Sequence, residues 1–160
     1  MYTPESLVDL HERGHRSLKV LLEHCGRMSQ DDLEREFEGF GYPSIRLQFH
    51  HLIGAEAYWI GVIAGRLDVD HDAGRYPTID ALERYRQTVF AQTKAYLERV
   101  SPQELNAPRA MTTWGGHERM LMPAHVFLRT ATHVYAHAGQ ILAMCRLLGK
   151  PASGTDFPLI

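Results

Sequence analysis

The sequence lacks clustered cysteines, long apolar runs and any marked excess of one charge. Its 160 residues include two cysteines, Cys25 and Cys145, far apart in the chain and each inside a helical pattern. We interpret both as reduced core residues rather than as a disulfide or a catalytic pair. The net charge is −2 and the two signs are interspersed, which argues against a nucleic-acid partner.

No apolar run approaches the roughly 20 residues that a membrane-spanning helix needs. The first residues, from Met1 to Ser6, also lack the pattern of a signal peptide. We therefore expect a cytoplasmic protein without a membrane partner. The length and the hydrophobic share of 44% are typical of one globular domain. The expected domain spans residues 1–160, with residues 151–160 as a C-terminal tail.

Apolar residues recur at three- and four-residue spacing in four segments, which predicts four helices at about residues 4–27, 45–66, 79–100 and 120–148. Shorter capping turns are expected to start at Ser29 and Ser101. Residues 106–119 are predicted to form an irregular loop, in which Trp114 is expected to cover the core, with a substrate contact as the alternative. No strand pattern occurs, so the predicted fold class is all-α, a four-helix bundle. The alternating Asp68, Asp70 and Asp72 do not form a calcium loop, because the required glycine and glutamate are misplaced.

The last predicted helix carries His133 and His137, which lie on one helix face because they are four residues apart. Two imidazole nitrogens placed in this way can bind one divalent ion at about 2.0–2.1 Å each. A chain with 10 histidines can also contain such a pair by chance. Val134 stands where a zinc protease carries a glutamate, which excludes that class. We expect the histidines of the first helix to be surface or boundary groups: His11, His15 and His24.

A third ligand is most readily supplied by His50 or His51 on the second predicted helix. The segment from His51 to Trp59, with Ser44-Ile45-Arg46 before it and Gly65-Arg66-Leu67 after it, resembles the second helix of the DinB-like family, which includes thiol transferases. The stretch from His133 to Ile141 is similar to the last helix of that family. The resemblance extends from the first helix to Gly149.

This resemblance implies a four-helix bundle of up-down-down-up topology with one divalent metal ion, nickel, zinc or iron, bound by three histidines. Carried over onto this sequence, the metal ligands are His51, His133 and His137. His50 is rotated by about 100° around the helix from His51, so the two cannot share a direction. Many members of the family have another histidine just before the last ligand, where this chain has Ala136.

Three neutral nitrogens with an open coordination position are typical of a catalytic metal site. We expect Arg129 and Gln140 to be candidate catalytic or substrate-binding residues, because both lie on the face of the histidine pair. A surface or ion-paired role is the alternative for Arg129. Glu56 is expected to lie outside the ligand set, with a contact behind the ligands as its alternative. Protons should compete with the metal around the ordinary histidine pKa of about 6.5.

The functional hypothesis is a metal-dependent transferase or hydrolase that acts on a small-molecule substrate, with a low-molecular-weight thiol as an implied co-substrate. The alternative is a metal-binding protein without turnover, either a sensor or a scaffold dimer. Tyr58 and Trp59 give the second helix more apolar surface than a small core readily uses, which predicts a homodimer. The family resemblance implies the same assembly.

Overall fold

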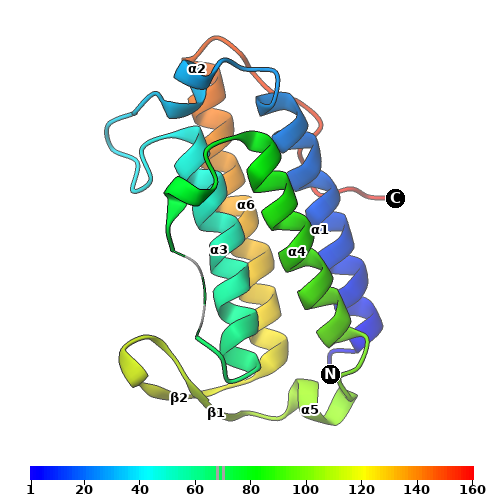
Figure 1. The fold of residues 1–160 in the computed structure, drawn as a ribbon. Coiled ribbons are helices and arrows are strands. Elements are labelled where there is room, and N and C mark those ends of the chain that lie inside the picture. Colours follow the sequence, from blue (N-terminus) through cyan, green and yellow to red (C-terminus); the bar gives the residue numbers. More distant parts are fainter. Residues whose placement is uncertain (68, 70) are drawn as a thin grey trace.

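The structure, a computed structural model, describes residues 1–67, 69 and 71–160 and is mostly helical, with one small two-stranded sheet. Four long helices lie side by side in Figure 1: α1 (Pro4–Cys25), α3 (Ile45–Ile63), α4 (Ile79–Leu97) and α6 (Pro123–Leu147). Helices α1 and α6 run in one direction, and helices α3 and α4 both run in the other. Both α1 and α3 contact α4 and α6, so each long helix has two neighbours.

Serine and threonine caps determine where the first three long helices begin. Thr3 accepts a hydrogen bond from the backbone N–H of Ser6, and Pro4 follows as the first helical residue. Ser44 caps α3 and Thr78 caps α4 in the same way. These starts agree with the sequence prediction. Asp68 and Asp70, two members of the alternating aspartate pattern, lie outside the described residues.

The two predicted capping turns are short helices, each of five residues. Ser29 caps α2 (Gln30–Glu34), and Ser101 caps α5 (Pro102–Asn106). A 3-10 turn at Ala73–Arg75 lies between α3 and α4. Helices α2 and α5 lie at opposite ends of the molecule (Figure 1).

The prediction of an irregular loop at residues 106–119 is wrong, because this region contains a hairpin. Strand β1 (Arg109–Thr112) pairs antiparallel with β2 (Glu118–Leu121). A 3-10 turn, Trp114–Gly116, joins the two strands, and Gly115 and Gly116 have φ of 71° and 76° there, which suits glycine. Residues 120 and 121 thus belong to a strand, and α6 begins later than predicted, at Pro123.

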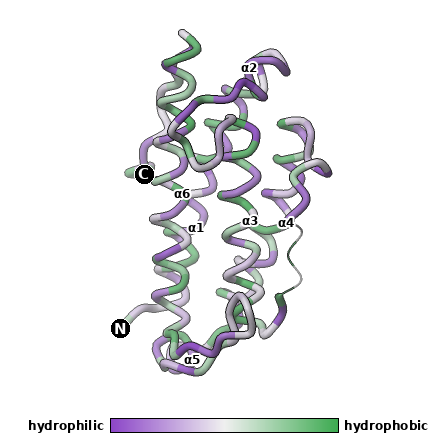
Figure 2. The backbone as a smooth tube through the Cα atoms, turned by 90° about the vertical axis from the view of Figure 1, so that its left-hand side faces the viewer, coloured by the Kyte–Doolittle hydropathy of each residue, from purple (hydrophilic) through white to green (hydrophobic). Residues whose placement is uncertain are grey.

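Apolar side chains of the long helices form two buried clusters. The cluster toward α2 contains, among others, Leu21, Leu22, Ile45, Phe49, Leu82, Ile141 and Met144. The cluster toward the hairpin contains Leu7, Ile60, Leu97, Leu105, Met111 and Phe127 among its members. Hydrophobic and hydrophilic stretches alternate along the helices in Figure 2, as expected for helices that bury one face. Within the described residues, no helix combines the length and the apolar character of a membrane span.

Cys25 and Cys145 are buried free cysteines whose Sγ atoms lie 3.9 Å apart, which confirms their prediction as reduced core residues. The C-terminal segment runs back along α1. Ser17 donates a hydrogen bond to the carbonyl oxygen of Asp156 at 2.8 Å, and Arg13 donates to that of Pro158 at 3.1 Å. These contacts attach the predicted tail to the first helix.

Candidate metal centre

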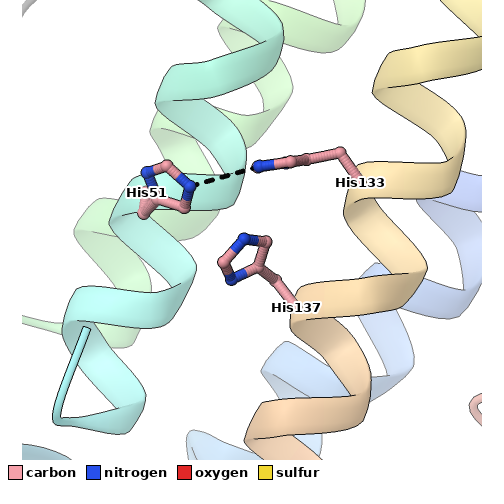
Figure 3. Close-up of side chains that lie close together, drawn as sticks. All are labelled: His51, His133 and His137. Atoms are coloured by element: carbon pink, nitrogen blue, oxygen red, sulfur yellow. Dashed lines mark hydrogen bonds between the residues drawn. The ribbon is translucent and has the colours of Figure 1, made fainter. Parts of the chain in front are cut away.

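Three histidines from two helices meet between α3 and α6. His51 projects from α3, and His133 and His137 project from successive turns of α6 (Figure 3). The Nε2 atoms of His51 and His133 are 3.2 Å apart. One potential ligand atom from each of the three lies within 4.8 Å of the others. The arrangement brings together the three residues that the family resemblance selects.

A row of side chains behind the histidines restrains two of them, His137 and His51. His137 donates from Nδ1 to the Oε1 atom of Gln48 at 2.6 Å, which leaves its Nε2 lone pair free to face the cluster. The amide of Gln48 donates to the Oε1 atom of Gln140 at 2.8 Å and to the backbone oxygen of Tyr42 at 2.7 Å. The Tyr42 ring stacks on His51, with centroids 3.8 Å apart. Gln48 therefore restrains the ring of His137, and Tyr42 restrains the ring of His51.

The three imidazoles are held in their neutral form. Burial, followed by the proximity of His137 and His133, lowers the pKa of His51 to about 4. Burial lowers the pKa of His133 to about 4 as well, with His137 and Arg129 adding to the effect. Burial also lowers the pKa of His137. Neutral imidazole is the form that binds metal, because its lone pair is not occupied by a proton.

The separation of the donor atoms fits a shared metal ion. Two nitrogens that bind one ion at about 2.0–2.1 Å, with an angle of roughly 90–110° between them, lie about 2.9–3.4 Å apart. The Nε2 atoms of His51 and His133 are 3.2 Å apart. The hydrogen bond between them needs one proton, and an ion placed there would take the position of that proton. The donor set thus suits a divalent ion of the zinc, nickel or iron class.

A cavity of about 570 Å³ lies directly beside His51 and His133. Its wall combines residues of α3 and α6 with the hairpin loop: Tyr42, His50, His51, Gly54, Ala55, Tyr58, Trp59, His71, Thr113, Trp114, Arg119, Arg129 and His133. Trp114 does not cover the core as predicted. It is 56% exposed and packs on Tyr58 at the rim of this cavity, with ring centroids 4.8 Å apart.

The candidate residues around the ligands have different roles in the structure. Arg129 lines the cavity, and its guanidinium lies 5.3 Å from the centre of the Trp59 ring. Gln140 lies behind the site, where it contacts Gln48 rather than the cavity. His50 is buried beside Tyr76 and is not part of the three-histidine group. Of the described residues, no fourth histidine, cysteine or carboxylate belongs to that group.

Gln48 is a residue of the candidate site that the sequence prediction missed. The available signal was a glutamine in a largely apolar helical segment, three residues before His51, because this spacing puts both side chains on one face. Its partner His137, however, is on another helix. Only the packing of α3 against α6 reveals the contact.

A second group of possible metal ligands lies among α1, α3 and α4. His11 and His15 approach the two carboxylate oxygens of Glu56, each from Nε2 at 2.8 Å. Thr93 donates to Oε1 of the same carboxylate at 2.6 Å. The prediction that His15 is a surface or boundary group is wrong, since it is buried with 6% exposure. Glu56 lies outside the three-histidine group, as expected.

The second group is arranged for hydrogen bonding rather than for metal binding. Arg86 donates from Nη1 to Nδ1 of His15 at 3.1 Å. Because an arginine can only donate, Nδ1 of His15 must accept, and the proton of this ring sits on Nε2, facing Glu56. A metal at Nε2 would force that proton onto Nδ1, against the guanidinium. We therefore interpret Glu56 as a buried acceptor that links three helices.

The fold and the site define a mostly helical protein with a three-histidine cluster beside a cavity. A model of the DinB superfamily matches residues 13–141. The chain therefore belongs to the DinB superfamily. The match includes all three histidines of the cluster, and it also covers the hairpin. No curated protein matches the chain in sequence.

Proposed function

We propose that this protein is a metal-dependent enzyme in which His51, His133 and His137 hold one divalent ion, with nickel, zinc and iron as the candidates. The observation that carries the proposal is the meeting of three imidazoles with lowered pKa values, two of which, those of His51 and His133, line a cavity of about 570 Å³. A four-helix bundle of up-down-down-up topology, with the ligands on α3 and α6, is part of the same proposal. We also propose that the protein is cytoplasmic.

An ion held by these three imidazoles would supply Lewis acidity, which would make a small thiol or a water molecule a better nucleophile. The side chains of this protein orient the metal ligands and select the substrate. Gln48 accepts a hydrogen bond from Nδ1 of His137 and thereby fixes the tautomer of this ring. Arg129 borders the cavity one helical turn before His133. The reaction class that we propose is thiol-dependent transfer or hydrolysis of a small molecule.

The alternative is a metal-binding protein without turnover, such as a sensor or a scaffold. A structural site is normally closed by four protein ligands, whereas a catalytic site keeps one position open. Among the described residues, three histidines form the cluster, and neither His50 nor His117 joins it. The adjoining cavity also offers room for a substrate next to two of the ligands. Both observations favour the enzyme.

Metal analysis of two neighbouring variants tests the proposed site. His51→Ala should reduce the bound metal from about one ion per chain to near zero, because only two ligands remain. His50→Ala is the matched control, since this side chain lies beside Tyr76 and outside the cluster. Metal content is measured by mass spectrometry after loading and desalting. Loss of metal from His50→Ala alone would mean that the wrong neighbour was chosen.

Replacing Gln48 tests the orienting role. Gln48→Leu should weaken metal binding by about 10–100-fold, because the Nδ1 hydrogen bond of His137 loses its acceptor. Gln48→Glu keeps an acceptor and should retain most of the affinity. Calorimetric titration of the metal-free proteins measures both values. Equal metal affinity of Gln48→Leu and the parent protein would show that the hydrogen bond between Gln48 and His137 does not assist metal binding. Gln92→Leu on α4 is the control for adding a leucine elsewhere.

The homodimer remains a prediction. It was based on the apolar surface of Tyr58 and Trp59 and on the family resemblance, and the structure weakens the first of these reasons. Tyr58 is buried, with its hydroxyl accepting a hydrogen bond from the Trp114 backbone N–H at 3.0 Å. Trp59 borders the cavity next to the histidine cluster. Neither aromatic ring therefore calls for a partner chain to cover it. The proposed dimer now rests on the family resemblance.

A further inference from the structure

The cavity beside the histidine cluster has a charge character of its own. Two arginines line it from different elements: Arg119 from strand β2 and Arg129 from helix α6. Within the described part of the chain, neither arginine forms an ion pair with a carboxylate, whereas several other arginines do, among them Arg13, Arg46, Arg86 and Arg109. None of the described lining residues carries a carboxylate. The cavity therefore presents positive charge that the described residues leave uncompensated.

Much of the remaining wall is aromatic. Four aromatic residues border the cavity: Tyr42, Tyr58, Trp59 and Trp114. The Trp114 ring lies 4.8 Å from Tyr58 and 4.7 Å from His71, measured between centroids. Flat rings of this kind offer large apolar surfaces to a planar ligand. Guanidinium groups bind carboxylates and phosphates through paired hydrogen bonds, and they stack on aromatic faces, as Arg129 does on Trp59.

We propose that this cavity binds a small organic anion, an acid with a planar apolar body whose negative group is held by Arg119 and Arg129. The inference rests on the proposed function, because it names the substrate class of the same cavity. The apolar body lies against Trp59 and Trp114, and the cavity wall brings the ligand to His51 and His133. The hairpin thus supplies half of the anion site and one of the aromatic walls.

The two tryptophans of the chain, Trp59 and Trp114, both line the cavity and therefore report its occupancy. The test compares phenylacetate with phenethyl alcohol, a neutral probe of similar size and shape. Each is titrated into chelator-treated protein while the tryptophan fluorescence is followed. We expect phenylacetate to bind at least about tenfold more tightly than the alcohol, since one charge-assisted contact accounts for such a ratio.

Variants assign this preference to the two arginines. Arg129→Gln and Arg119→Gln should each reduce the preference for the anion several-fold, and the double variant should abolish it. Arg146→Gln, an exposed arginine on the same helix as Arg129, is the matched control and should leave it unchanged. Binding of the neutral alcohol should change little in all four proteins. That result would also show that the cavity has kept its shape.

Three results would overturn the proposal: equal binding of the two probes, no saturable binding of either, or a preference that survives in the double variant. Because the titrations use metal-free protein, they do not depend on the metal ligands. Loss of metal binding in His51→Ala is measured separately. A protein that prefers the anion but binds no metal would refute the proposed enzyme and leave the anion site in place. A protein that binds metal but does not prefer the anion would refute the anion site and leave the proposed metal site in place.

Discussion

Loading with a divalent ion is expected to stabilise the protein by about 2.7 kcal/mol when the free ion is at 100 times its dissociation constant. This follows because an ion that binds the folded chain alone shifts the unfolding equilibrium by mass action. For a chain of this length, the increment corresponds to a rise in Tm of roughly 5–10 °C. Chelator-treated protein should remain folded, since two buried apolar clusters hold the long helices together without the ion.

The increment should persist to mildly acidic pH. Burial lowers the pKa of all three histidines in the folded metal-free protein, and that of His51 and His133 to about 4, so protons compete with the ion at lower pH than the ordinary histidine pKa implies. The ordinary histidine pKa of about 6.5 would instead predict loss of the increment below about pH 6. Thermal melts with metal and with chelator, at about pH 7.5 and about pH 5.5, should differ by a similar amount. Loss of most of the increment at the lower pH would mean that these rings titrate as exposed histidines do.

The stability of the metal-free protein should also depend on pH, and the direction of this dependence can be stated. A histidine with a lowered pKa in the folded state binds fewer protons there than in the unfolded chain between about pH 6.5 and about pH 4. Stability must therefore rise with pH across this window. His51→Ala removes one such group, so its metal-free form should lose less stability on acidification than the parent. This comparison separates proton competition at the site from general acid sensitivity.

Patterns within the sequence are sufficient to identify the four long helices and the histidine pair of the last one. Each long helix had an apolar stripe, and three began at a serine or threonine cap, which are local signals. The histidine pair was visible because its two members are one turn apart on a single helix. The choice of His51 over His50, in contrast, came from the family resemblance. The structure brings His51, and not His50, to the pair.

Contacts between distant segments could not be predicted. The hairpin strands have four residues each, and Met111 is the buried member among them, so no alternating pattern was available. Trp114 lines the cavity only because the hairpin folds back onto α3, where its backbone N–H meets the Tyr58 hydroxyl. Similarly, His15 looked like a surface group because its partner, Glu56, comes from another helix.

Replacing that buried carboxylate, Glu56→Gln, is expected to lower the free energy of unfolding by about 3 kcal/mol. Glu56 is 4% exposed and accepts hydrogen bonds from His11, His15 and Thr93, which join α1, α3 and α4. A glutamine has one acceptor oxygen, and its NH₂ group would face a histidine that also donates. The exposed Glu12→Gln, which removes a surface pair with Lys94, should change stability by no more than about 0.5 kcal/mol.

The pH dependence of this difference has a definite sign. Burial alone would raise the pKa of the Glu56 carboxyl, but attraction and hydrogen bonds from His15 and His11 outweigh it and hold the pKa well below its usual range. The carboxylate therefore contributes its stability fully above the unfolded pKa of about 4.3 and loses it as pH falls through the folded value. Urea unfolding of both proteins should give a constant difference between about pH 6 and 8 that narrows below about pH 4. A difference that widened on acidification would mean that Glu56 is protonated in the folded protein, and the three-helix link would then need another explanation.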